Sequence, residues 1–301
     1  MRLSEDNVKL FYKLNPALLL FVNLRLGLRK KVVNIKDFLS LKLEKKVEVR
    51  NALYDNIDLI DEFVEKNPEN YSSKELDIVS SWKHFLKSTF YVFRHLKNYS
   101  VFLSSETEAK AYGVLGISSD LKEMFPHLPI MVDTVLMPFK QHVIYDGFMA
   151  PYSMTFGGGI IRNFKTSYDE AKAKFGIITN LPFEPEEKRP SDSDLLKFYL
   201  KNQRNREIYW EEIQDLIYDD PGLLAVYHQE TGKSYSRSIK KRLREIGVKA
   251  AWFASLEGII IANGKTKKEV ETNLKQIVPA DRLNHVYTFQ FKGVGKKSSR
   301  L

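Results

Sequence analysis

The spacing of apolar residues predicts helices through the first part of the chain. Between residues 51 and 64 they recur at intervals of three or four positions, which is the repeat of an amphipathic helix. Ser72 and Glu75 have the Ser-x-x-Glu spacing of a capping box, so a second helix is expected to begin there and to continue to about residue 87. Nearer the start, Asn15-Pro16 is a typical helix beginning, and the segment 31–35 has the composition of a short strand.

From residue 89 the pattern changes to short runs of aromatic and β-branched residues, which favour strands. Five or six such runs are expected to be strands: 89–96, 99–103, 110–117, 131–137 and 142–145, with 148–155 as the optional sixth. The runs 131–137 and 142–145 are separated by a short break at Pro-Phe-Lys-Gln, so they should pair antiparallel. A helix is predicted at 166–175, covering one end of the sheet. The first domain should therefore have helices packed on an antiparallel sheet or a small β-barrel.

The segment 181–194, LPFEPEEKRPSDSD, has the composition of a linker. It contains three prolines, a cluster of charges and a Ser-Asp repeat, with few large apolar side chains. We therefore expect one domain over residues 1–180 and a second over 195–295, both of ordinary size. The Lys/Ser-rich tail 296–301 is expected to be disordered.

The second domain is expected to combine helices with a few strands, which gives the whole chain an α+β class. Its predicted helices are 194–202, 206–218, a basic helix over 236–246 and 265–277, and its predicted strands are the hairpin 251–256 with 259–262 and the last strand 286–291. Gly247 should end the basic helix, because glycine accepts the left-handed conformation of a helix C-cap.

Residues 252–291 carry a resemblance to a known domain. The stretch WFASLEGIIIANGKTKKEVETNL, from Trp252 to Leu274, is followed by the terminal strand YTFQF. It resembles a small uncharacterised β-β-α-β domain of prokaryotic proteins, in which a hairpin with this pattern of apolar residues, alanine and Gly-Lys precedes a helix. The resemblance implies a fold for about 40 residues and no catalytic residue.

Composition and charge narrow the classes of function. The chain has 301 residues, 43% of them hydrophobic, and no cysteine, so disulfides, thiolate metal sites and cysteine nucleophiles are excluded. Its longest apolar run near the start is too short to cross a membrane, and acidic residues stand where a signal peptide would be basic. A cytoplasmic protein without a membrane partner is therefore expected. The formal charge of +9 raises the expectation of a polyanionic partner such as nucleic acid.

Two glycine-containing segments are candidates for anion binding. Gly264-Lys265-Thr266 ends like a phosphate-binding loop, but five residues that belong to a strand separate it from Gly258, so the loop is not expected to bind phosphate. Gly157, Gly158 and Gly159, followed by Arg162, are the better candidate, because glycine lets backbone amides approach an oxyanion. A glycine triplet also serves where a strand leaves a sheet.

His142 and Asp146 are the weak candidates for catalysis. They lie four residues apart on a predicted strand and should share a face, although Asp146-Gly147 is also a typical turn. The histidines are scattered without metal-ligand spacing, so no metal site is predicted, and the chain has no Gly-x-Ser-x-Gly nucleophile motif. No cofactor is expected.

The basic helix gives the leading functional prediction. Seven Lys or Arg residues against one acid, Glu245, fall between Lys233 and Lys249. At 100° per residue the apolar positions share one side of the helix, and the opposite side carries Arg237, Lys240, Lys241 and Arg244. Helices before it and a hairpin after it also suit a winged helix.

Three functions are therefore carried forward. The first is a non-catalytic, regulatory or accessory protein that binds DNA or RNA through these four side chains. The second is an enzyme acting on a phosphorylated small molecule at Gly157–Gly159, with Arg162, His142 or Asp146 assisting. The third is a structural or partner-binding protein. The sequence does not indicate an oligomeric state.

Overall fold

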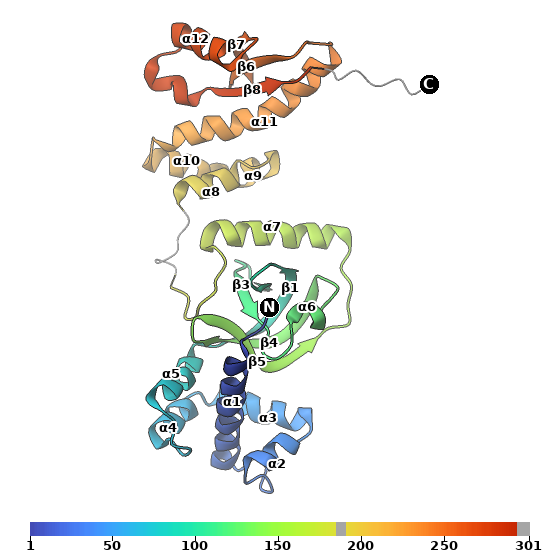
Figure 1. The fold of residues 1–301 in the computed structure, drawn as a ribbon, viewed down its shortest axis with the longest axis vertical. Helices are drawn as coiled ribbons and strands as arrows, with labels where there is room; N and C mark the ends of the chain where they lie inside the picture. Colours follow the sequence, from blue (N-terminus) through green and yellow to red (C-terminus); the bar gives the residue numbers. More distant parts are fainter. Residues whose placement is uncertain (185–190, 294–301) are drawn as a thin grey trace, which may run out of the picture. The chain divides into compact units, whose positions relative to one another are not determined.

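The computed structural model describes residues 1–184 and 191–293, which form two compact units (Figure 1). The units are Met1–Arg189 and Pro190–Leu301, so the division falls within the segment 181–194 for which a linker was predicted. Residues 185–190 of that segment and the predicted tail 296–301 lie outside the described residues. The chain has an α+β fold, and each unit is described separately below.

The first unit begins with five helices gathered around one of them, α1 (Figure 1). The helices are α1 (Glu5–Leu26), α2 (Ile35–Ser40), α3 (Leu43–Asp55), α4 (Asp58–Lys66) and α5 (Ser73–Ser81). Helices α2 to α5 all contact α1, whose side chains Leu14, Leu18 and Val22 are fully buried. Burial on several sides at once explains why α1 lacks a simple amphipathic pattern in the sequence.

Four of the predictions for this region need correction. Pro16 lies inside α1 rather than at a helix start, and the segment 31–35 leads into α2, where Asn34 caps the helix by accepting from the Asp37 amide. The single helix expected at 51–64 is two helices that break at Asn56. The helix capped at Ser72 ends at Ser81, although the predicted capping box is present.

A closed five-stranded barrel forms the rest of the first unit. Its strands are β1 (Leu86–His95), β2 (Ser100–Ser104), β3 (Ala111–Leu115), β4 (Ile130–Phe139) and β5 (His142–Pro151), in the order β1-β2-β3-β5-β4. The predicted antiparallel pairing of β4 with β5 is confirmed. The sheet is mixed, however, because β3 and β5 run parallel. The chain joins β3 to β4 through the short helix α6 (Leu121–Met124), and a 3₁₀ turn, η1 (Trp82–His84), precedes β1.

The outside of the barrel is covered by α7 (Gly158–Phe175), which begins earlier than predicted (Figure 1). Tyr168 and Ala171 of α7 are buried in one cluster with Val101 and Leu103 of β2. The Tyr168 ring lies 5.3 Å from the ring of Phe93, between ring centroids. The helix therefore occupies an aromatic face of β1 and β2.

The second unit has a helical layer, one long helix and a covered sheet (Figure 1). The helical layer consists of α8 (Asp192–Tyr199), α9 (Gln203–Ile208) and α10 (Trp210–Asp219), and the long helix is α11 (Leu223–Glu245). The sheet has the order β7-β6-β8 and is antiparallel throughout, from β6 (Ala251–Leu256), β7 (Ile259–Gly264) and β8 (Tyr287–Phe291). The remaining elements are α12 (Lys267–Ile277) and the 3₁₀ turn η3 (Ala280–His285).

The two faces of this sheet pack against different helices. On one face Leu243 of α11 is buried against Phe253 and Phe289, and on the other Val270 and Leu274 of α12 are buried against Ala254. The predicted hairpin is confirmed, but it belongs to this covered sheet, so it is not the free wing of a winged helix. Elements 251–291 have the β-β-α-β order that the resemblance implies.

Candidate nucleic-acid interface

The long helix α11 is held rigidly between two layers of the second unit (Figure 1). It starts at Leu223, well before the predicted residue 236, because the apolar run after Gly222 continues into the same helix. Its contact with the sheet is close at Gly232, where a Cβ atom would lie only 2.4 Å from the Cβ of Tyr287. The other side of the helix packs on α8 and α10. The first half of α11 is therefore fixed.

The last turns of α11 present a group of exposed cations, which we call the basic end and define as Arg237, Lys241, Arg242 and Arg244. Three of them, Arg237, Lys241 and Arg244, lie within about 60° of one another around the helix axis. Within the described part of the chain, none of the four side chains takes part in a hydrogen bond or an ion pair. The basic end is thus free to contact an anion.

Lys240 does not belong to the basic end, although its position in the sequence suggested it. Its side chain is half-buried, and its ammonium nitrogen lies 5.2 Å from the centroid of the Phe289 ring on β8. A cation over a ring face is stabilised by the quadrupole of the ring. Its helical position, nearer the sheet-facing side than that of Arg237, allows this contact.

Helix α8 and the turn that follows it bring two more lysines to the same side of α11. A small cavity of about 260 Å³ is lined by Lys197 of α8, by Lys201 after the end of that helix, and by Lys233 and Arg237 of α11. Lys197 pairs with Asp194 at 3.1 Å and Lys233 with Glu230 at 3.5 Å, so these cations are partly neutralised. Sequence reasoning missed Lys197 and Lys201 because only the packing of the two helices brings them beside α11.

Basic residues of the first unit contrast with the basic end. Arg25 pairs with Glu62 at 2.8 Å, Lys13 with Glu75 at 2.6 Å, and Arg29 with Glu48. Six of the twelve Lys and Arg residues among the first 50 therefore form ion pairs with acids. The basic end differs in that its four unpaired cations fall within eight consecutive residues of one helix.

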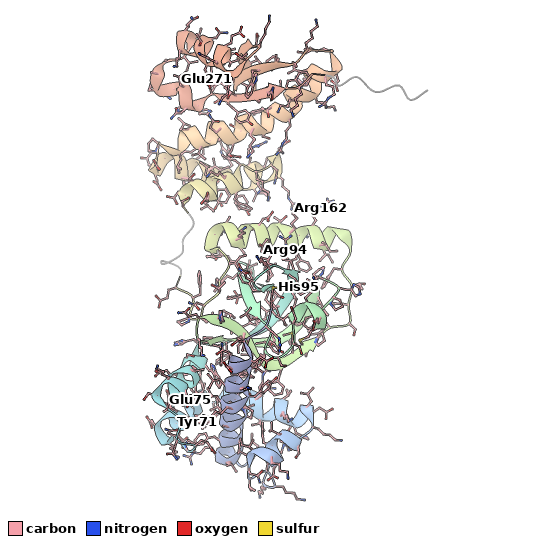
Figure 2. All side chains as sticks on the ribbon, in the orientation of Figure 1. Tyr71, Glu75, Arg94, His95, Arg162 and Glu271 are labelled. Carbon is pink, nitrogen blue, oxygen red and sulfur yellow. The ribbon has the colours of Figure 1, made fainter. Side chains whose placement is uncertain are left out.

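The glycine triplet starts a helix rather than wrapping a loop. Gly157 is the N-cap of α7, and Gly158 and Gly159 form its first turn. All three are exposed, and a Cβ atom on any of them would meet nothing within 4 Å. Arg162 is also exposed, on the side of α7 away from the barrel (Figure 2). The triplet and Arg162 thus share one helix end, on an open surface.

Beside this helix end lies a separate apolar cavity of about 630 Å³. Phe156 and Ile161 line it together with Leu128 and Pro151. Arg162, His142 and Asp146 are not among its lining residues. The cavity therefore does not combine the groups on which the enzyme hypothesis depended.

Asp146 is occupied by a buried network rather than by a turn or by His142. Its carboxylate accepts from Arg50 Nε at 2.5 Å, from Tyr54 Oη at 3.1 Å and from the Phe148 amide at 3.2 Å. Burial raises the pKa of Asp146, while the Arg50 guanidinium opposes that shift, and burial also raises the pKa of Tyr54. The network ties α3 to β5.

His142 lies apart from this network. It is exposed at the first position of β5, and no hydrogen bond within the described residues joins it to Asp146. The two side chains differ in burial, because His142 begins the strand at the surface, whereas Asp146 is 1% exposed and lies where the register against β4 shifts.

A further pair of histidines comes together in the second unit. The rings of His228 and His285 stack with their centroids 4.9 Å apart. Burial lowers the pKa of His228, and the neighbouring His285 adds to that shift.

Among residues 1–184 and 191–293 there is no group of three or more His, Cys, Asp or Glu side chains placed to hold a metal ion. Nor is any helix in these ranges both long and apolar enough to cross a membrane.

Comparison with models of known protein families, with curated proteins and with solved structures gave no match to the chain.

Proposed function

We propose that the chain is a non-catalytic nucleic-acid-binding protein, in a regulatory or accessory role, whose contacts to phosphate come from the second unit. The observation that carries this proposal is the basic end of α11, in which four exposed cations lack an acidic partner within the described residues. Arg237, Lys241 and Arg244, three of the predicted site residues, belong to it. Lys240, the fourth, is drawn toward Phe289 and is expected to contribute less.

Rigidity of the helix supports the proposal. Because Leu243 packs the last turns of α11 against Phe253 and Phe289, the backbone that carries these cations does not have to be ordered when a ligand binds. Arg and Lys contacts to phosphate release counterions, so the affinity of such a protein falls steeply with salt. Lys197 and Lys201 line the cavity beside Arg237 and so place two further lysines next to the basic end.

The barrel of the first unit is a weaker candidate for this function. Five-stranded Greek-key barrels can bind oligonucleotides across the face of their second and third strands. Here α7 covers part of that face, and Arg94 lies beneath the helix, 4.9 Å from the centroid of the Tyr168 ring (Figure 2). A fold alone does not imply a function, so the proposal depends on the second unit.

The experiment is fluorescence anisotropy with labelled single-stranded and duplex 20-nucleotide oligonucleotides over a salt series. The test variant replaces Arg237, Lys241 and Arg244 with Gln. The matched control replaces Lys265, Lys268 and Lys275 with Gln, because these exposed lysines lie at or on α12, which covers the opposite face of the sheet. Both variants lose three positive charges.

We expect the wild type to bind at low salt and the test variant to bind at least tenfold more weakly. The slope of log affinity against log salt should decrease by about two to three, since each phosphate contact contributes roughly 0.7 to 0.9. The control should stay within threefold of the wild type. Absence of binding at low salt, or an equal loss in the control, would contradict the proposal.

A further inference from the structure

An open groove lies on the side of α11 next to the basic end. It has a volume of about 690 Å³ and is formed by α9, α10 and α11. Three aromatic side chains line it, Trp210, Tyr227 and Tyr235, with Arg206, Gln203 and Thr231 between them. No part of this groove was singled out from the sequence, because its residues come from three helices.

Two of the rings are unusually exposed for their size. Trp210 is 55% exposed and Tyr235 is 45% exposed. No other aromatic ring within the described residues packs against either of them, whereas Tyr91, Phe156 and Phe164 in the first unit pack against one another. Trp210 and Tyr235 therefore present ring surface to a ligand.

The polar groups of the groove are held in place by hydrogen bonds. Arg206 Nη1 donates to the Leu200 carbonyl oxygen at 3.2 Å, which fixes the guanidinium. Glu207, the acid of the groove, accepts from the Gln203 amide at 2.9 Å. Arg206 balances the charge of Glu207, so the groove is suited to stacking on its aromatic rings rather than to binding a strongly charged group.

The groove and the basic end lie on adjacent sides of the same helix. Tyr227, Thr231 and Tyr235 follow one another at every fourth position, and the next turns on that side carry Ser238 and Arg242. The side with Arg237, Lys241 and Arg244 is the neighbouring one. A nucleotide strand whose phosphates contact the basic end can therefore turn its bases toward the groove.

We infer that the groove stacks unpaired bases, so that the ligand of the second unit is single-stranded nucleic acid rather than a duplex. Bases in a duplex are already stacked on both faces and cannot lie on Trp210, whereas those of a single strand can. This inference rests on the proposed function, because the basic end supplies the phosphate contacts. Beyond the proposed function, it states that the protein prefers single strands to duplexes and that the aromatic residues of the groove cause this preference.

The test compares Trp210→Ala with Tyr218→Ala in the full chain. Both residues are aromatic side chains of α10, but Tyr218 is 87% exposed and lies outside the groove. Trp210→Phe is the conservative variant. Tyr235 is less suitable for this test, because its ring packs closely on Gly258, 3.2 Å from where a Cβ of that glycine would lie. Removing the Tyr235 ring would therefore also disturb the β6–β7 turn. The probes are fluorescein-labelled dT20, U20 and a 20-base-pair duplex.

We expect the wild type to prefer dT20 or U20 over the duplex by at least tenfold. Trp210→Ala should weaken single-strand binding about tenfold or more and change duplex binding by less than twofold, while Trp210→Phe should retain most of the affinity and Tyr218→Ala all of it. Binding of dT20 should also quench the fluorescence of Trp210, since stacking places a base on its indole. This quenching should be absent in Trp210→Phe, which lacks that indole.

Several results would overturn the inference. Equal affinity for single strand and duplex, or an equal loss of both in Trp210→Ala, would overturn the inference. The proposed function would still stand in that case, provided that the variant at Arg237, Lys241 and Arg244 loses binding. Quenching by tetramethylammonium without quenching by dT20 would assign the groove to a cation. If the wild type binds no oligonucleotide at low salt, the proposed function and this inference fail together.

Discussion

At the scale of single residues, Asp146 shows how a charged side chain can serve the fold. A carboxylate that is 1% exposed is tolerated because Arg50, Tyr54 and the Phe148 amide all donate to it. Arg50 is itself only 11% exposed, and its guanidinium carbon lies 5.4 Å from the centroid of the Tyr54 ring. Helix α3 and strand β5 are therefore joined by one coupled network.

Replacing Arg50 with Gln should destabilise the first unit strongly. The Asp146 carboxylate would be left buried without its counter-charge, which costs about 3–5 kcal/mol of unfolding free energy. Burial already raises the pKa of Asp146, and the loss of Arg50 removes the charge that opposes this shift. The destabilisation should therefore be smaller at pH 4 than at pH 7, because protonation of the carboxyl removes the unpaired charge. Urea unfolding at both pH values measures this.

The control for this change is Arg25→Gln. Arg25 pairs with Glu62 at 2.8 Å, but its side chain is 55% exposed, so the pair is screened by water and its loss should have little effect. A second variant, Arg50→Met with Asp146→Leu, removes both charges and should recover much of the stability. Equal stability of Arg50→Gln and the wild type at pH 7 would show that the network does not stabilise the fold.

At the scale of elements, the three glycines before and within the first turn of α7 begin a helix, and no neighbouring atom is close enough to require glycine there. Gly158 and Gly159 have helical backbone within α7, and nothing lies within 4 Å of a Cβ at either position. Alanine is the better helix former by about 0.8–1 kcal/mol in a helix interior, and part of this difference applies in the first turn. The double change Gly158→Ala with Gly159→Ala should therefore raise the unfolding free energy of the first unit by up to about 1 kcal/mol.

Thermal unfolding of this variant, compared with the wild type, measures the effect. The variant also bears on the alternative function, because a phosphate bound by the backbone amides of the triplet would require the glycines for its close approach. A loss of stability, or a loss of inorganic phosphate binding that the wild type shows, would contradict the interpretation of the triplet as a helix start alone.

How much of these elements could be predicted from the sequence depends on how local their determinants are. The strand pair 131–137 with 142–145 and the hairpin 251–262 were predictable, because alternation and a turn specify each of them within a few residues. Helix α1 was not, because Pro16 favours a helix start locally and only burial against the other helices of the unit holds the longer helix together.

The candidate site was predictable to a smaller degree. The basic side of α11 is a local pattern and could be read directly, except for Lys240, whose contact with Phe289 depends on the sheet. The aromatic groove was not predictable, since Trp210 and Tyr235 approach each other only after three helices have packed. The role of Asp146 was missed for the same reason, because Arg50 lies 96 positions away in the chain.

At the scale of the whole molecule, the two units have separate apolar cores. The cluster that contains Leu18 and Phe90 and the one around Tyr168 have residues of the first unit only, and those around Leu243 and Val270 have residues of the second only. A domain with its own core unfolds cooperatively by itself. Calorimetry of the full chain should therefore show two thermal transitions.

Two substitutions assign these transitions. Gly232→Ala places a Cβ 2.4 Å from the Cβ of Tyr287, so α11 and β8 must move apart, which costs roughly 1–3 kcal/mol. Gly232→Ala should lower the melting temperature of the second unit by several degrees and leave that of the first unchanged. Arg50→Gln should lower the melting temperature of the first unit only. Because the basic end lies beyond Gly232 on the same helix, Gly232→Ala should also weaken oligonucleotide binding as its transition approaches the assay temperature, whereas Arg50→Gln should not. A single transition that both substitutions lower equally would show that the units unfold as one.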